Sequence, residues 1–250
     1  MTTSTTSKDI LLGAVAYDAK VVPIWEGIRE HFREQGVGFD FALFSNYERQ
    51  VESLLAGHVD IAWNTPLGHV RVKRRTDGKS LSLGMRDSDR DFHAKVIVRK
   101  DSGIRSLADL AGITLAVGSR DSTQARILPL HFLRAAGVDL AKVRLLPFDT
   151  DLGKHGDTGT SELDVLQALR DGLAQAGTVG DLVWVAEQAA GRVDPKQIEV
   201  LWTTPRRHLQ SPPARATITT TNMTPFRRAT SGGRNTIPGS HPATGGLVPP

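Results

Sequence analysis

The segment 114–129 constrains the fold more than any other part of the chain. Its first four residues are typical of a buried strand, a loop of small and polar residues follows, and a helix then begins. Asp121, Ser122 or Thr123 can cap that helix, which leaves backbone N–H groups pointing out of its first turn. These groups and the helix dipole favour negative charge, so the segment predicts a site for a small anion. The alternative is an ordinary strand-to-helix turn with a capping side chain.

Strand and helix patterns alternate along the first part of the chain. Strands are expected at 10–16, 39–44 and 59–63, with helices at 23–35 and 47–56 between them. This order is typical of a parallel α/β unit with right-handed crossovers. Two further strands are expected at 81–85 and 94–99.

A second α/β lobe is expected from residue 114 onward. Its expected strands are 114–117, 143–147, 182–185 and 198–202, and its expected helices are 127–136 and 162–173, after a short helix at 107–110 capped by Ser106. The chain then divides into a disordered N-terminus at 1–9, a first lobe at 10–95, a second lobe at 96–198 and a return crossover at 199–205. At 250 residues, the chain is long enough for two such cores.

Two segments, 47–63 and 162–177, echo one another weakly. Each combines an amphipathic helix, a glycine and a short apolar strand. Two lobes built alike, with a ligand in the cleft between them, would produce this echo. Chance is the alternative, because helix–glycine–strand units are common in α/β proteins.

Composition changes at Pro205. Residues 205–250 contain eight of the thirteen prolines and six arginines but no acidic residue. Removing those six positive charges from the net +4 leaves about −2 for residues 1–204, so the basic balance does not predict nucleic-acid binding. The segment 206–250 lacks apolar periodicity and is expected to be disordered. A shifted reading frame would produce such a boundary, and a genuine disordered extension is the alternative.

Composition also excludes several kinds of site. Without cysteine, the chain has no disulfide, thiolate metal site or cysteine nucleophile. The eight histidines lack metal-ligand spacing, and neither a Walker loop nor a dinucleotide fingerprint is present, so no metal and no cofactor is expected. No apolar run reaches the ~18 residues of a membrane span. The start of the chain lacks the apolar core of a secretory signal, so a cytoplasmic location fits the chain as written.

Four segments together resemble a known family. They are Val-Asp-Ile-Ala-Trp-Asn-Thr-Pro at 59–66, Lys-Val-Ile-Val-Arg-Lys-Asp-Ser-Gly-Ile at 95–104, Leu-Ala-Asp-Leu-Ala-Gly-Ile-Thr-Leu-Ala-Val-Gly at 107–118 and Ser-Arg-Asp-Ser-Thr at 119–123. The chain resembles the substrate-binding component of phosphate, phosphite and phosphonate ABC transporters, from about residue 10 to Pro205. The resemblance implies a two-lobed, type 2 periplasmic-binding-protein fold with a ligand cleft between the lobes.

The same resemblance implies a function. It indicates a non-enzymatic protein that captures a small oxyanion, works with an ABC transporter permease and lies in the periplasm or outside the cytoplasm. Two alternatives stay open: a cytosolic enzyme of this fold acting on a small anionic metabolite, and a regulatory ligand-binding domain. Family members continue past Pro205 with segments that complete the first lobe, so the aberrant C-terminus predicts an incomplete first lobe.

Pocket residues are also implied by the resemblance. The family's oxyanion-binding Ser-Thr pair falls on Ser122 and Thr123, and Gln124 stands where the family usually has serine. The other implied ligand-binding residues are Tyr47, Asn64, Thr65, Phe92, His93 and His155. Hydroxyl donors at the Ser-Thr pair suit a tetrahedral oxyanion, which accepts several short hydrogen bonds.

Overall fold

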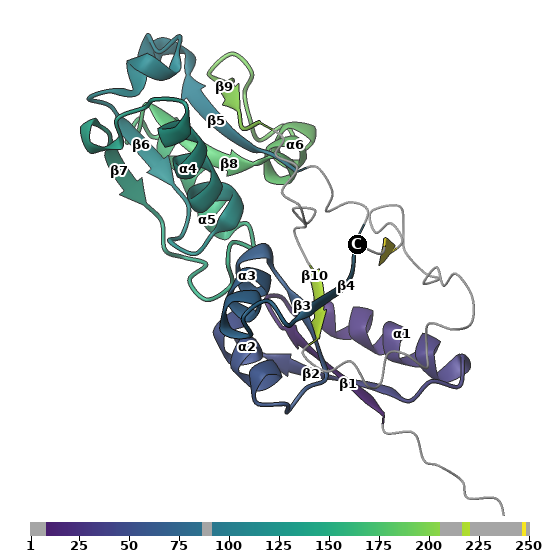
Figure 1. The fold of residues 1–250 in the computed structure, drawn as a ribbon. Helices are drawn as coiled ribbons and strands as arrows, with labels where there is room; N and C mark the ends of the chain where they lie inside the picture. The colour runs from purple at the N-terminus through teal and green to yellow at the C-terminus, as the bar shows by residue number, and fades with distance from the viewer. Residues whose placement is uncertain (1–8, 87–91, 206–216, 221–246, 249–250) are drawn as a thin grey trace, which may run out of the picture. The chain divides into compact units, whose positions relative to one another are not determined.

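The computed structural model describes residues 9–86, 92–205, 217–220 and 247–248 (Figure 1). The chain divides into two compact units. Of the described residues, the first unit contains 9–86, 217–220 and 247–248, and the second unit contains 92–205. Each unit is a sheet with helices on both faces. None of the helices in these described ranges is long and apolar enough to cross a membrane.

The first unit is built on a sheet with the strand order β11-β4-β10-β3-β1-β2. Its strands are β1 (Ile10–Val15), β2 (Phe39–Phe44), β3 (Ile61–Asn64), β4 (Leu81–Arg86), β10 (Thr217–Thr220) and β11 (Leu247–Val248). Its helices are α1 (Val21–Glu34), α2 (Tyr47–Leu55) and α3 (Pro66–Arg75). Strands β1, β2 and β3 are parallel, whereas β10 runs antiparallel to both of its neighbours, β3 and β4.

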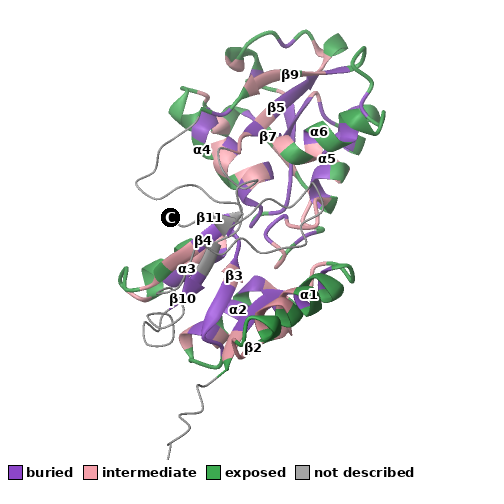
Figure 2. Cartoon of the chain, turned by 90° about the vertical axis from the view of Figure 1, so that its right-hand side faces the viewer, coloured by how far each residue is buried: buried purple, intermediate pink, exposed green. Residues whose placement is uncertain are grey.

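Alternate side chains of the parallel strands enter two different cores. Leu12 packs with Trp25 of α1 on one face, and Leu11 packs with Leu54 of α2 on the other. This double burial explains the continuous apolar run at 10–16, because a strand covered on both faces has no solvent side. Figure 2 shows the buried residues of these strands in purple and the exposed residues of the helices in green.

The second unit has a sheet with the order β7-β6-β8-β5-β9. Its strands are β5 (Ala94–Arg99), β6 (Thr114–Val117), β7 (Arg144–Pro147), β8 (Ala176–Gly180) and β9 (Ile198–Thr203). Its helices are α4 (Leu128–Ala135), α5 (Thr160–Arg170) and α6 (Asp181–Ala189), with short turns η2 (Lys100–Ser102), η3 (Leu107–Leu110), η4 (Thr123–Ile127) and η5 (Leu140–Lys142). Helices α5 and α6 contribute to the core on one face, and α4 and η3 to the core on the other.

The two sheets share one strand pattern. Each has three adjacent parallel strands, β2-β1-β3 in the first sheet and β7-β6-β8 in the second. In the first sheet, β10 pairs antiparallel with β3, and β4 pairs antiparallel with β10. In the second sheet, β5 pairs antiparallel with β8, and β9 pairs antiparallel with β5. Helix α2 precedes β3 as α5 precedes β8. The two echoing segments, 47–63 and 162–177, therefore occupy equivalent places in the two units.

Most expected elements are present within a few residues, but two differ. Residues 182–185, expected as a strand, belong to helix α6, and the strand is β8 just before it. A Cβ atom at Gly177 of β8 would lie 2.6 Å from Val165 Cγ1, so glycine is favoured there, where β8 packs against α5. Helix α3 was not expected, because its only buried residues are Gly68 and Val72 and its apolar periodicity is weak.

The expected domain boundaries also change. The boundary between residues 95 and 96 falls inside β5, which pairs with β8 and β9 in the second unit. Most of the expected crossover at 199–205 is β9, an edge strand of the same sheet.

Within the expected disordered tail, residues 217–220 instead form β10, because they satisfy the ladder groups of both β3 and β4. The predictions for residues 1–8, 206–216, 221–246 and 249–250 lie outside the described residues.

We expect Thr219→Pro to destabilise the first unit strongly. Thr219 is fully buried, β10 has partners on both sides, and proline would remove a ladder hydrogen bond in the middle of the sheet. The free energy of unfolding should fall by about 1–3 kcal/mol, the cost of leaving a buried carbonyl partner unsatisfied, in urea titrations followed by circular dichroism. Thr219→Ser, which keeps the backbone N–H and a hydroxyl, is the matched control. Equal midpoints for the two variants would show that 217–220 do not belong to the sheet.

Candidate functional site

The end of β6 comes unusually close to the helix that follows it. Gly118 N–H donates to the Ala125 carbonyl oxygen at 3.0 Å. A Cβ atom at position 118 would lie 2.6 Å from the Ala125 Cβ, so a side chain cannot be accommodated there. The same carbonyl oxygen accepts from Thr178 Oγ1 of β8 at 2.5 Å. These contacts hold the start of the helix against the ends of two neighbouring strands.

Ser122 caps that helix. Its Oγ accepts from Ala125 N–H at 3.1 Å, and Ile127 N–H donates to its carbonyl oxygen at 3.0 Å, five residues back. The helix therefore opens with the π turn η4 before α4 begins. A serine cap contributes about 1 kcal/mol to stability. Of the three capping candidates, the structure selects Ser122, whose hydroxyl can still donate its own hydrogen.

Three side chains around the cap each carry a buried polar atom with no hydrogen-bond partner among the described residues. They are Ser119 Oγ, Asp121 Oδ1 and Thr123 Oγ1, in side chains that are 0%, 6% and 7% exposed. Leaving such a group unsatisfied costs about 1–3 kcal/mol, so a ligand that bonds to it is favoured. The sequence identified Thr123 as a ligand donor, treated Asp121 only as a possible cap, and did not single out Ser119.

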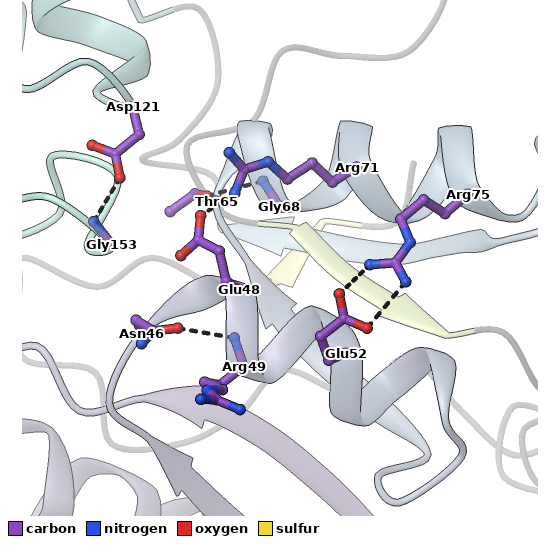
Figure 3. Close-up of polar contacts among 10 residues, drawn as sticks. All are labelled: Asn46, Glu48, Arg49, Glu52, Thr65, Gly68, Arg71, Arg75, Asp121 and Gly153. Carbon is purple, nitrogen blue, oxygen red and sulfur yellow. Dashed lines mark hydrogen bonds and ion pairs between the residues drawn. The ribbon is translucent and has the colours of Figure 1, made fainter.

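The loop between β7 and α5 packs against this one. Asp121 Oδ2 accepts from Gly153 N–H at 2.6 Å (Figure 3), and Gln124 Nε2 donates to the Gly156 carbonyl oxygen at 3.1 Å. Gly156 has a φ of +81°, and a Cβ there would lie 2.5 Å from Ser122 Oγ. Glycine is therefore required where the two loops touch.

His155 lies on the same packed loop. It is 1% exposed and adopts a φ of +54°, a conformation that residues other than glycine rarely take. One of its ring nitrogens lies within 4.8 Å of an Asp121 carboxylate oxygen. The structure thus brings His155 and Gln124 to the loop that holds Ser122 and Thr123.

The two arginines of this segment face one carboxylate. Asp149 accepts from Arg120 N–H at 2.8 Å and from the Arg120 guanidinium at 2.8 Å, and Arg126 Nη1 lies 3.7 Å from its Oδ1. The hydrogen bonds from the Arg120 side chain and backbone lower the pKa of Asp149, and its carboxylate raises the pKa of Arg120. Both arginines thus pair with Asp149, and the loop can in addition offer a bound anion the hydroxyl groups of its described side chains and its backbone N–H groups.

Two predicted site residues of the first unit, Asn64 and Thr65, lie where β3 ends. Asn64 is fully buried, its Oδ1 accepts from Gln50 Nε2 at 2.9 Å, and its Nδ2 has no partner among the described residues. Thr65 caps α3 by accepting from Gly68 N–H at 3.2 Å. A Cβ at position 68 would lie 2.8 Å from Asn64 Oδ1, so a glycine is needed in this first turn.

Tyr47 opens α2 and is 1% exposed. The helix is capped by Asn46, whose Oδ1 accepts from Arg49 N–H at 2.9 Å (Figure 3). Helix α2 is joined to α3 by ion pairs from Glu48 to Arg71 and from Glu52 to Arg75, also drawn in Figure 3. These pairs are solvent-exposed, so they add little to stability.

Phe92 and His93 are half-buried and directly precede β5. His93 N–H donates to Asp181 Oδ2 at 3.2 Å, and its ring Nδ1 lies 2.7 Å from the Thr204 carbonyl oxygen. His93 therefore connects the start of β5 to α6 and to the residue after β9. Its ligand-binding role stays a prediction, as does that of Phe92.

We expect Thr123→Val to stabilise the protein in the absence of ligand. Valine matches threonine in shape and removes a buried hydroxyl that lacks a partner, so the free energy of unfolding should rise by about 1 kcal/mol. Thr178→Val is the matched control, because it removes a buried hydroxyl that does bond, and it should lower the free energy by a similar amount. Thermal and urea unfolding measure both changes. A loss of stability in both variants would contradict the unsatisfied state of Thr123.

Comparisons with known proteins identify relatives of this chain. It is 25% identical over 166 residues to the probable ABC transporter phosphite binding protein PhnD1 of Prochlorococcus marinus, an alignment that covers 64% of this chain. The alignment covers 53% of that relative, so the chain spans about half the length of the curated relative it matches.

Solved structures show the same fold. PhnD1 of Prochlorococcus marinus in complex with methylphosphonate has a TM-score of 0.60 at 21% identity, covering 86% of this chain and 77% of that one. XAC2383 of Xanthomonas citri bound to ATP has a TM-score of 0.61 at 23% identity, with the same coverages of 86% and 77%. The aliphatic sulphonate binding protein SsuA of Escherichia coli has a TM-score of 0.56 at 14% identity, covering 85% and 65%.

The family model described as "ABC transporter, phosphonate, periplasmic substrate-binding protein" matches residues 14–217. The match continues beyond Pro205, where the resemblance was expected to end, and reaches the first residue of β10. Because it spans well over half of the chain, the chain belongs to the family of phosphonate-type periplasmic substrate-binding proteins of ABC transporters.

Proposed function

We propose that this protein captures a small tetrahedral oxyanion, namely phosphate, phosphite or a phosphonate, for an ABC importer, and that it binds the anion at residues 119–124. The observation that carries the proposal is the pair of buried hydroxyls of Ser119 and Thr123, which lack a partner among the described residues. They lie at the start of a helix that runs through η4 into α4.

The chemistry of the loop suits this ligand. A tetrahedral oxyanion accepts several short hydrogen bonds, and hydroxyl and backbone N–H groups at a helix N-terminus supply donors together with a favourable dipole. Since Arg120 and Arg126 both pair with Asp149, we assign much of the binding energy to these dipoles. The named ligands of PhnD1, phosphite and methylphosphonate, belong to the same chemical class.

Further residues within each unit are proposed to bind ligand. In the second unit they are Ser122, Gln124 and His155, which pack around the same loop, with Phe92 and His93 before β5. In the first unit they are Tyr47, Asn64 and Thr65. Asn64 is the strongest of this group, because its buried Nδ2 can donate to an anion.

Family membership supports the remaining parts of the proposal. The relatives are named as binding proteins of transporters, so we propose a permease partner, a location outside the cytoplasm and no catalytic activity for this chain. No described feature favours the alternative of a cytosolic enzyme of the same fold.

We expect Ser119→Ala combined with Thr123→Val to weaken methylphosphonate binding more than tenfold. Hydrogen bonds to a charged partner are worth roughly 1.5–3 kcal/mol each, and the double variant removes two of them. Isothermal titration calorimetry measures the loss. Because Thr123→Val should stabilise the fold, weaker binding cannot be attributed to unfolding.

The matched control is Ser102→Ala, which removes a hydroxyl that donates to the Arg99 carbonyl oxygen in the turn after β5. This control should bind as the unmodified protein does. Ser122→Ala is a poorer test, because it also removes the helix cap. Unchanged affinity in the double variant would place the anion elsewhere.

A further inference from the structure

A buried carboxylate shares the anion-binding loop with the two hydroxyls. Asp121 is 6% exposed, and its Oδ2 is fixed by the N–H of Gly153. Its Oδ1 is buried and has no hydrogen-bond partner among the described residues. Figure 3 shows the carboxylate with one oxygen bonded to Gly153 and the other unbonded among the residues drawn. A bound anion would therefore lie near a second negative group, the Asp121 carboxylate.

Hydrogen-bond chemistry limits how the anion and the Asp121 carboxylate can lie next to each other. An ionised carboxylate only accepts hydrogen bonds, so Oδ1 needs a donor. Arg120 and Arg126 pair with Asp149, although the Asp121 charge also acts on Arg120. The His155 ring nitrogen lies within 4.8 Å of an Asp121 carboxylate oxygen, but Oδ1 has no hydrogen bond among the described residues. Two anionic oxygens without a hydrogen between them repel strongly in a buried setting. An O–H group on the ligand would convert this repulsion into a charge-assisted hydrogen bond.

We infer that Asp121 selects oxyanions that keep one acid proton, with the ligand O–H donating to Asp121 Oδ1 while Ser119 and Thr123 donate to the unprotonated oxygens. This inference rests on the proposed function and narrows its substrate class to hydrogen phosphonates, hydrogen phosphite and protonated phosphate. It also predicts rejection of sulfonates, which share the shape and the single charge but have no acid proton. A site built around a ligand O–H discriminates strongly against analogues that lack it.

The decisive comparison pairs methylphosphonate with methanesulfonate in mildly acidic buffer, where both are monoanions and only the first carries an O–H. We expect the unmodified protein to bind methylphosphonate at least tenfold more tightly. Taurine, a sulfonate with an ammonium group, tests whether an N–H donor can serve instead. Calorimetric titration of all three ligands gives the ratios without any substitution.

Asp121→Asn then tests the residue itself. The amide oxygen can still accept from Gly153 N–H, which leaves an NH₂ group as a donor in place of Oδ1. We expect the preference for methylphosphonate over methanesulfonate to shrink at least tenfold, mainly through tighter sulfonate binding. Asp139→Asn is the matched control, because this exposed capping carboxylate lies on η5 in the same unit. It should leave the ratio unchanged.

Each outcome decides the question. Equal binding of methylphosphonate and methanesulfonate by the unmodified protein would overturn the inference while leaving the proposed function intact. An undiminished preference for methylphosphonate in Asp121→Asn would also overturn it. Tight binding of taurine would show that the donor to Asp121 can be an ammonium N–H, which would overturn the requirement for an acid proton. Failure to bind any of phosphate, phosphite and methylphosphonate would reject the proposed function itself. If Asp121→Asn does not fold, the comparison in the unmodified protein still decides.

Discussion

The candidate anion site depends on a close approach between backbones at the end of β6. Gly118 lies against Ala125, whose carbonyl oxygen is also bound by Thr178, and Gly156 lies against Ser122. A Cβ atom at either glycine would collide with these neighbours. Because these two positions have no side chain, the end of β6, the start of the helix at η4 and the loop between β7 and α5 can pack closely together. This packing buries the polar groups between them.

That burial has a thermodynamic cost which the rest of the second unit must offset. The hydroxyls of Ser119 and Thr123 and one oxygen of Asp121 are buried without partners among the described residues. Apolar cores on both faces of the sheet supply the compensating stability. Ligand-binding sites commonly contain such locally destabilising groups. A bound ligand can then form the hydrogen bonds that these groups lack in the folded protein.

The two units follow one plan, and in each the sheet is completed by strands from outside its parallel part. In the second unit, β5 precedes and β9 follows the three parallel strands in the chain. Strand β5 pairs with β8, and β9 pairs with β5. In the first unit, β10 inserts between β3 and β4, and Thr219 lies 3.1 Å from the His69 ring of α3, 150 residues earlier. The first sheet therefore depends on a segment whose composition, rich in threonine, proline and arginine, gives little sign of order.

Local patterns in the sequence determined the two α/β units, most of their elements and the position of the candidate anion loop, because apolar periodicity, capping residues and glycines act over a few neighbouring positions. Only the tertiary structure decided that Ser122 is the cap, that Asp121 and Ser119 are buried, and that residues 182–185 are helical. It also placed β10 in the first sheet. Burial and strand pairing arise from contacts between residues far apart in the chain, and no local pattern records which polar atoms those contacts leave without a partner.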